Sequence, residues 1–381
     1  MRGKPPGLYI HIPFCLRKCI YCGFNSRPFG SNEIGPYLKA LRAEMERISS
    51  TLGGTVRTIY IGGGTPTSLS ERELEFLLSS ISDLFKAPED GEFTIEANPG
   101  TLSPEKVKIM KDFGVNRISL GVQSFNDDEL NFLGRLHSSK DSLSSYEMIV
   151  DSGISNVNLD LIFGIPGQGL SSWRMSLETA LSLSPKHLSL YELTVEEGTL
   201  LQLWVDRGIV RTLEEDEIVA MYEMAWDLVE GRGYEHYEIS NYAIPGYRSI
   251  HNQIYWRNEE YIGCGAGAVS FIGGRRKRNI SDPISYVNAM MRDGDATEEE
   301  EKPSEIQAFQ EAIMLGLRML DGIDLLRLSE RYGIGLDNIW EGIEGLASHG
   351  FLTYDGKVKL TKKGMLVSNR IIAEIMALTE G

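Results

Sequence analysis

Three of the four cysteines of this 381-residue chain stand close together near its start. Cys15, Cys19 and Cys22 lie within the stretch "FCLRKCIYC", whereas Cys264 is far along the chain. The opening residues show no apolar segment followed by a small-residue cleavage site, so we expect a cytoplasmic protein with reduced thiols. Clustered cysteines in such a protein are metal ligands or catalytic groups more often than disulfide partners.

Three kinds of site could use this cluster. A structural zinc site needs four ligands, so a distant His or Cys would have to complete it. A redox pair would use Cys19 and Cys22 alone and would leave Cys15 unexplained. An iron–sulfur cluster binds thiolates, and three thiolates on a four-iron cluster leave one iron open to a small molecule with an amine and a carboxylate. The number and spacing of the cysteines favour this third interpretation.

The first half of the chain alternates short strand-like runs with amphipathic helical stretches. Ser70 and Ser103 each stand at an N-cap position of such a stretch, with a glutamate close behind. This alternation predicts βα units and a parallel sheet, and the lack of a GxGxxG motif favours a partial barrel over a doubly wound sheet. The predicted strands are residues 8–13, 56–62, 92–98, 117–123, 156–164 and 187–194.

Polar residues stand where several of these predicted strands end. They are residues 62–65, Glu96, Gln123 and Asp160, and the cysteine cluster directly follows the first strand. In parallel βα barrels the carboxyl ends of the strands meet on one rim, which carries the active site. We therefore expect these residues to line a single pocket.

The rest of the chain departs from this rhythm. Residues 231–302 are rich in Gly and aromatic residues and look irregular, and residues 303–381 are helical with a two-strand ribbon around Asp355-Gly356. We expect three parts: a barrel over 1–230, the irregular segment over 231–302, and a winged-helix-like module over 303–381. No basic recognition helix stands out in that module, so we expect it to act as scaffolding.

The charge pattern limits the partners. The formal net charge is −16, which argues against nonspecific binding to nucleic acid. No apolar run approaches the ~18 residues of a membrane helix. We interpret the basic run over 275–278 as a solvated hairpin turn, and the acidic run over 298–301 as a solvated linker or the first turn of a helix.

The spacing C-x3-C-x2-C, with Tyr21 before the last cysteine, resembles the signature of the radical S-adenosylmethionine (SAM) superfamily. The stretch "YIGGGTPTSL" resembles the glycine motif of that family. The resemblance implies a [4Fe-4S] cluster on the three cysteines, whose open iron chelates SAM. One electron then cleaves a C–S bond of SAM to give a 5′-deoxyadenosyl radical. It also implies that Gly63, Gly64 and Thr65 let the backbone approach the SAM amino group.

A narrower resemblance runs over nearly the whole chain. The stretches "LYIHIPFC", "IEANPGTL", "RISLGVQSF", "LGRLH", "NLDLIFGIPGQ" and "LSLYELT" resemble the branch containing oxygen-independent coproporphyrinogen III oxidase and its relatives. It implies an α/β fold, a radical SAM partial (β/α)6 TIM-like barrel with an α+β C-terminal extension. The residues that it assigns to SAM are Tyr9, Glu96, Gln123, Arg135 and Asp160, with carboxylates for the ribose hydroxyls and Arg135 for the SAM carboxylate.

Two departures separate the chain from the oxidases of this branch. Phe24 stands where they have a fourth cysteine, and only seven residues precede Leu8. The stretch "HNQIYW", residues 251–256, matches instead the HNxxYW signature of the haem-chaperone group. This resemblance implies that His251 binds haem iron and that the protein passes haem to acceptors such as respiratory haem proteins. Val269 replaces a His that relatives often carry, and we expect Cys264 to be a small buried residue.

The leading hypothesis is therefore a haem chaperone that carries a SAM-binding [4Fe-4S] cluster, with haem as its cargo. The alternative is an oxygen-independent coproporphyrinogen III oxidase, which would decarboxylate porphyrinogen propionates by radical oxidation, or another radical SAM enzyme. Whether the chain is an enzyme stays open at this point. A homodimer and a peripheral contact with the membrane also stay open. We expect no nucleic-acid partner.

Overall fold

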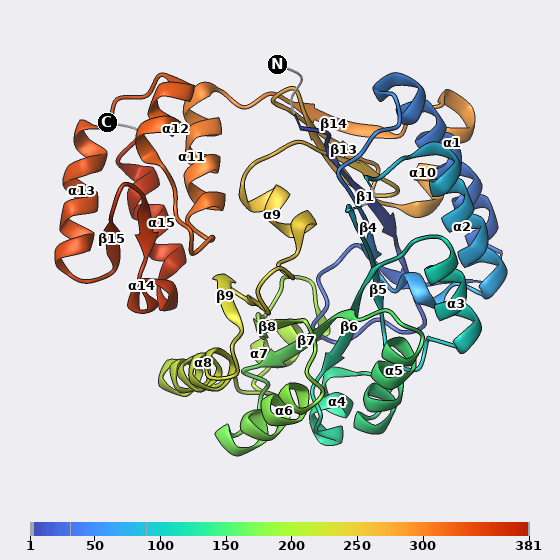
Figure 1. The fold of residues 1–381 in the computed structure, drawn as a ribbon, viewed down its shortest axis with the longest axis horizontal. Coiled ribbons are helices and arrows are strands. Elements are labelled where there is room, and N and C mark those ends of the chain that lie inside the picture. Colours follow the sequence, from blue (N-terminus) through green and yellow to red (C-terminus); the bar gives the residue numbers. More distant parts are fainter. Residues whose placement is uncertain (1–3, 31, 89, 380–381) are drawn as a thin grey trace.

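The computed structural model describes residues 4–30, 32–88 and 90–379. Within these residues a twelve-stranded sheet forms the centre of the molecule, with helices along its outer face (Figure 1). In spatial order its strands are β14 (Thr297–Glu301), β13 (Arg275–Asn279), β12 (Val269–Ile272), β11 (Tyr261–Cys264), β1 (Gly7–Ile12), β4 (Thr58–Gly63), β5 (Glu92–Ala97), β6 (Arg117–Gln123), β7 (Asn156–Phe163), β8 (His187–Glu192), β10 (Asn241–Ala243) and β9 (Glu235–Glu238).

The six predicted strands are β1, β4, β5, β6, β7 and β8, and each pairs in parallel with the next. On the other side of β1, β11 adds a further parallel strand. Antiparallel strands then extend the sheet at both edges, which end in β9 and β14. The predicted α/β fold with a partial barrel is therefore confirmed. Cys264 is fully buried and unpaired in β11, as expected.

Two of the helices that follow parallel strands begin at the serines that the sequence analysis predicted as N-caps. Ser70 and Glu73 form a capping box at α2, and the Ser103 hydroxyl accepts the Lys106 N–H at α3. The helices over this half are α1 (Ile34–Leu52), α2 (Glu71–Leu84), α3 (Pro104–Asp112), α4 (Asp127–Leu133), α5 (Ser139–Asp151), α6 (Leu170–Ser182), α7 (Leu200–Asp206) and α8 (Glu215–Glu230).

The basic and acidic runs pair with each other, so our interpretation of both runs was wrong. The basic run forms β13 and the acidic run forms β14, in antiparallel register with Arg276 opposite Glu301 and Lys277 opposite Glu300. Arg276 also donates to Glu311 on α11 (Glu305–Gly316). Opposite charges across a strand pair stabilise the pairing. The basic run also pairs with β12 on its other side, whereas the acidic run has β13 as its strand partner.

The C-terminal part is a bundle of helices with a small ribbon, and it lies beside the sheet (Figure 1). After α11 it contains α12 (Leu325–Tyr332), α13 (Asp337–Ser348), β15 (Leu352–Tyr354), β16 (Val358–Leu360), α14 (Lys362–Leu366) and α15 (Ser368–Ala377). Between this module and the sheet lies α9 (Ile250–Trp256), and α10 (Pro283–Asp293) packs on α1. Among the described residues, we find no helix with the length and apolar character needed to cross a membrane.

Replacing Arg276 by Met should lower the free energy of unfolding by about 1–2 kcal/mol, because Glu301 and Glu311 both lose a charged donor. The matched control is Arg275→Met. Its ion pair with Glu300 is more exposed, and we expect a loss below about 0.5 kcal/mol. Urea denaturation measures both, and equal losses would contradict this account of the β13–β14 pair.

Candidate functional site

The carboxyl ends of the parallel strands surround a cavity of about 390 Å³. Cys15 ends β2 (Phe14–Cys15), and Cys19 and Cys22 reach the cavity from the loop between β2 and β3 (Arg27–Pro28). The sequence-predicted residues that line it are Cys15, Cys19, Cys22, Gly63, Gly64, Thr65, Glu96, Gln123, Arg135 and Asp160. The predicted convergence on one rim is thus observed, and their roles as ligands stay predictions.

Each of the three thiols has a polar neighbour. The Thr65 hydroxyl donates to Cys15 Sγ over 3.6 Å, and Arg135 Nη1 donates to Cys19 Sγ over 3.5 Å. Cys22 Sγ lies 4.0 Å from the Ser26 hydroxyl. Burial raises the pKa of the Cys15 thiol, and the hydrogen bond from Thr65 partly offsets this effect.

In the described part of the chain, no three His, Cys, Asp or Glu side chains are grouped so that they could hold one metal ion. The three free thiols open onto a shared cavity. Its walls combine the carboxylates of Glu96 and Asp160 with apolar residues such as Ile162 and Leu193. A set of three thiolates beside such a space suits a cluster with an open iron.

The glycine turn after β4 lies directly against the first strand. The Gly64 N–H donates to the Ile12 carbonyl over 2.8 Å, and the Thr65 N–H donates to the Phe14 carbonyl over 2.8 Å. A Cβ at Gly64 would lie 2.6 Å from that Phe14 oxygen, and Gly63 has a φ of 113°. The structure therefore gives these glycines a packing reason besides the ligand approach that the sequence suggested.

Two buried carboxylates face the cavity. Glu96 accepts the Tyr60 hydroxyl on Oε1 over 2.8 Å and the Gly63 N–H on Oε2 over 3.0 Å, and burial raises its pKa to about 7. Asp160 accepts from Ser119 and Asn158, and burial raises its pKa as well. A carboxylate has about four acceptor positions, so each retains capacity for a ligand hydroxyl.

Arg135 is held by a residue that the sequence analysis did not single out. Its Nη2 donates to Asn98 Oδ1 over 2.7 Å and to the Gly121 carbonyl over 2.8 Å. Asn98 also donates to Thr65 Oγ1 over 2.9 Å. The signal was its place in "EANPG", two residues after Glu96 on the same strand end.

Gln123 ends β6 in a strained conformation. Its φ is 67°, in the left-handed region, and the register between β6 and β7 shifts between Gly121 and Gln123. Such strain costs roughly 1–3 kcal/mol and is concentrated at functional sites. Gln123 lines the cavity in this conformation.

Tyr9 is not among the residues that line the cavity. Its hydroxyl donates to His11 Nδ1 over 2.9 Å, because His11 Nε2 is occupied as the donor to the Asn25 carbonyl. Its ring lies beside that of Tyr60, with the centroids 6.1 Å apart. In this structure Tyr9 therefore contacts the loop that carries Cys19 and Cys22 indirectly, through His11 and the Asn25 carbonyl.

His251 lies at the opposite end of the sheet from the cysteines. Its ring is fully buried, with Nδ1 2.7 Å from Thr58 Oγ1 and Nε2 2.9 Å from the Tyr255 hydroxyl. Thr58 begins β4, whereas Gly63, which lines the cavity, ends it. Burial, followed by the charge of Arg117, lowers the pKa of His251 to about 3, so the imidazole is neutral at physiological pH.

The start of α9 is fixed by a second residue that the sequence analysis missed. The Glu92 carboxylate accepts the Ser249 hydroxyl, the Ile250 N–H over 2.7 Å and the His251 N–H over 3.1 Å. A buried carboxylate at a helix N-terminus satisfies free N–H groups and complements the helix dipole. Nothing in the sequence links β5 to this helix, since the two are more than 150 residues apart.

Family models match two parts of the chain. Residues 9–180 match the Radical SAM superfamily, and residues 304–367 match the HemN C-terminal domain. A solved structure of coproporphyrinogen III oxidase (HemN) from Escherichia coli matches with a TM-score of 0.85 and 21% identity, covering 98% of this chain and 90% of that one. At that identity the match shows a common fold.

Curated relatives match over nearly the full length. Heme chaperone HemW from Bacillus subtilis is 40% identical, covering 97% of this chain and 98% of the relative. Heme chaperone HemW from Escherichia coli is 34% identical, with 98% of each chain covered. By these likenesses, the chain belongs to the HemW family of the radical SAM superfamily.

Proposed function

We propose that this protein is a haem chaperone, which binds haem, transfers it to acceptor proteins, and carries a SAM-binding [4Fe-4S] cluster on Cys15, Cys19 and Cys22. The observation that carries the proposal is the near-full-length likeness to curated proteins named heme chaperone. The likeness to coproporphyrinogen III oxidase supports the fold alone. Phe24, where the resemblance places a fourth cysteine in the oxidases, weighs against that activity.

In this proposal the rim residues hold SAM. The cluster, when bound, would supply an open iron to the amine and carboxylate of SAM. Arg135 presents its guanidinium to the SAM carboxylate, and Glu96 and Asp160 accept the ribose hydroxyls. The N–H groups of Gly63, Gly64 and Thr65 are already bonded within the protein, so the turn offers carbonyl oxygens to the SAM amine.

We propose that His251 binds the haem iron only after its present partners release it. A neutral imidazole is the form that binds a metal, and its low pKa supplies that form. Nε2 has to leave the Tyr255 hydroxyl, and because both residues lie on α9 this requires a rotation of the Tyr255 side chain. Exposing the buried ring also requires α9 to move away from Thr58 on β4. We further propose a cytoplasmic location, haem acceptors that include respiratory haem proteins, and a homodimer or a membrane contact during transfer.

Cys19→Ala should abolish the iron–sulfur absorbance and SAM binding of the reconstituted protein, because two thiolates rarely hold such a cluster. Cys264→Ala is the matched control, since Cys264 is buried away from the cavity and should leave both signals unchanged. Iron content, absorbance and SAM binding are measured anaerobically. A cluster fully retained by Cys19→Ala would contradict the ligand assignment.

SAM should bind more weakly as the pH falls below 7. Burial raises the pKa of Glu96 to about 7, so below that pH the carboxyl carries a proton, which it has to lose in order to accept the ribose hydroxyls. The dissociation constant should then rise towards about tenfold per pH unit. Equilibrium dialysis between pH 6 and 8 measures this slope. Glu96→Gln should bind weakly at every pH with a flat profile, and an equal slope in both proteins would refute the role of Glu96.

A haem titration of the reconstituted protein tests the function itself. We expect a saturable Soret shift in the wild type, a weaker one in His251→Gln, and two- to tenfold tighter binding in Tyr255→Phe, because that change removes a competing hydrogen bond worth about 0.5–1.5 kcal/mol. Equal weakening in both variants would show that the hydrogen bond, and not iron ligation, matters. No shift in the wild type, together with SAM-dependent decarboxylation of coproporphyrinogen, would establish the oxidase alternative instead.

A further inference from the structure

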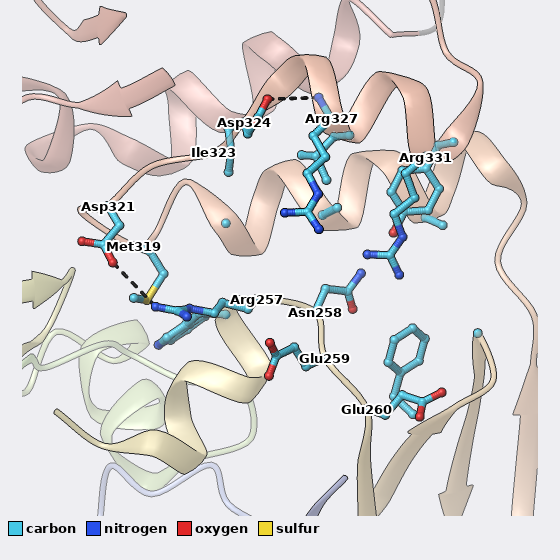
Figure 2. A pocket seen from close by; sticks show the side chains of 18 of the residues that line it. Arg257, Asn258, Glu259, Glu260, Met319, Asp321, Ile323, Asp324, Arg327 and Arg331 are labelled. Atoms are coloured by element: carbon cyan, nitrogen blue, oxygen red, sulfur yellow. Dashed lines mark hydrogen bonds and ion pairs between the residues drawn. The ribbon is translucent and has the colours of Figure 1, made fainter. Parts of the chain in front are cut away.

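A second cavity, of about 980 Å³, lies between the end of α9 and the C-terminal module. Its walls come from Trp256 and the loop after it, from Phe271 on β12, and from α11 and α12 (Figure 2). It shares no lining residue with the cysteine cavity. Its volume is at the upper end of the ~300–1,000 Å³ that small-molecule pockets occupy.

The acidic residues that line this cavity are already engaged. Glu259 pairs with Lys4 and Arg57, and Asp321 pairs with Arg248 and Arg257. Asp324 caps α12 by accepting the Arg327 N–H, and Glu260 accepts the Gly273 N–H. Cations therefore compensate Glu259 and Asp321, whereas backbone N–H groups hold Glu260 and Asp324.

Two of its arginines are not engaged in this way. In the described ranges 4–30, 32–88 and 90–379, no carboxylate pairs with the guanidinium of Arg327 or Arg331, and the latter contacts the Tyr332 ring only. Figure 2 shows both side chains pointing from α12 towards the loop that carries Asn258. Like charges four residues apart on a helix repel each other. Both side chains are exposed, and neither Asp324 nor Glu330, the acids next to them in the chain, pairs with either guanidinium. In a chain of net charge −16, such a pair marks a site for an anion.

Aromatic and aliphatic residues make up much of the rest of the wall. They include Trp256, Phe271, Tyr332, Met319 and Leu328, of which Phe271 and Met319 are largely buried. The indole N–H of Trp256 is buried without a hydrogen-bond partner. This combination suits a broad planar ligand with an apolar body and a carboxylate edge.

We infer that the haem cargo docks in this cavity. This inference rests on the proposed function. The macrocycle lies against the aromatic wall near Trp256, and the two propionates bind Arg327 and Arg331. These residues are four apart on α12, so both guanidiniums face one side and can meet two carboxylates on one edge of the ring. Arginine binds carboxylates through paired N–H donors. The cargo thus sits beside the motif that carries His251 and away from the cluster. His251 does not line this cavity, so the haem docks here first, and His251 binds its iron only after Tyr255 has released Nε2.

The test compares Arg327→Gln/Arg331→Gln with the control Arg72→Gln/Arg370→Gln, which removes the same charge from exposed positions outside both cavities. Each full-length, reconstituted protein is titrated with haem and with haem dimethyl ester, whose propionates are uncharged. We expect the cavity variant to bind haem roughly tenfold more weakly and the control to match the wild type. The wild type should prefer haem to the ester, and the cavity variant should bind the two equally.

The ester separates lost carboxylate contacts from misfolding, because a misfolded protein would lose both ligands together. If the wild type binds haem but the cavity variant binds it equally well and still prefers it to the ester, the docking site is wrong and the proposed function stands. Loss of both ligands in the cavity variant, with the cluster absorbance lost too, would show that the arginines serve folding and would also overturn the inference. No haem binding by the wild type would overturn the function and the docking site together.

Discussion

The close contact between Gly64 and the backbone of Phe14 determines where the cysteine loop lies. No side chain fits between them, and the two hydrogen bonds beside the contact tie the end of β4 to the end of β1. From there a chain of contacts runs through Thr65 to Cys15, and through Asn98 and Arg135 to Cys19. Backbone packing and these side-chain contacts together position the thiols at the strand ends. The acceptor positions of Glu96 and Asp160 that no protein group uses are available to a ligand.

Strand β4 contacts both the cysteine cavity and the buried imidazole of His251. The Tyr60 hydroxyl donates to Glu96 in the cysteine cavity, while its ring stacks on His251 with the centroids 5.0 Å apart. Thr58, two residues earlier, contacts the same imidazole. The proposed SAM site and the motif on α9 are thus separate in space, but both are in contact with β4. A carrier that keeps its cargo apart from a redox-active cofactor can use such an arrangement, since the haem does not have to enter the cavity that the thiols line.

The parallel strands, the serine caps and the convergence of the rim residues were predictable, because each depends on a local pattern such as alternation, a capping serine or a polar strand end. Features that depend on contacts between distant segments were not. The basic run forms β13 between β12 and the acidic run, which forms β14. Glu92, at the start of β5, holds the N-terminus of α9. His251 was identified by its motif, yet its burial between Thr58 and Tyr255 follows from tertiary packing. The arginine-lined cavity needs the end of α9 and α12 to lie on two sides of one space, which no spacing in the sequence indicates.

The central claim is that cargo and cluster occupy different ends of the fold. The most direct test is a haem titration of a variant in which Cys15, Cys19 and Cys22 are all replaced by Ser, with circular dichroism to confirm folding. The account predicts a protein without a cluster that still binds haem with a dissociation constant within about twofold of the wild type, since the second cavity contains none of these residues. Loss of haem binding by this variant, with its fold intact, would contradict the account.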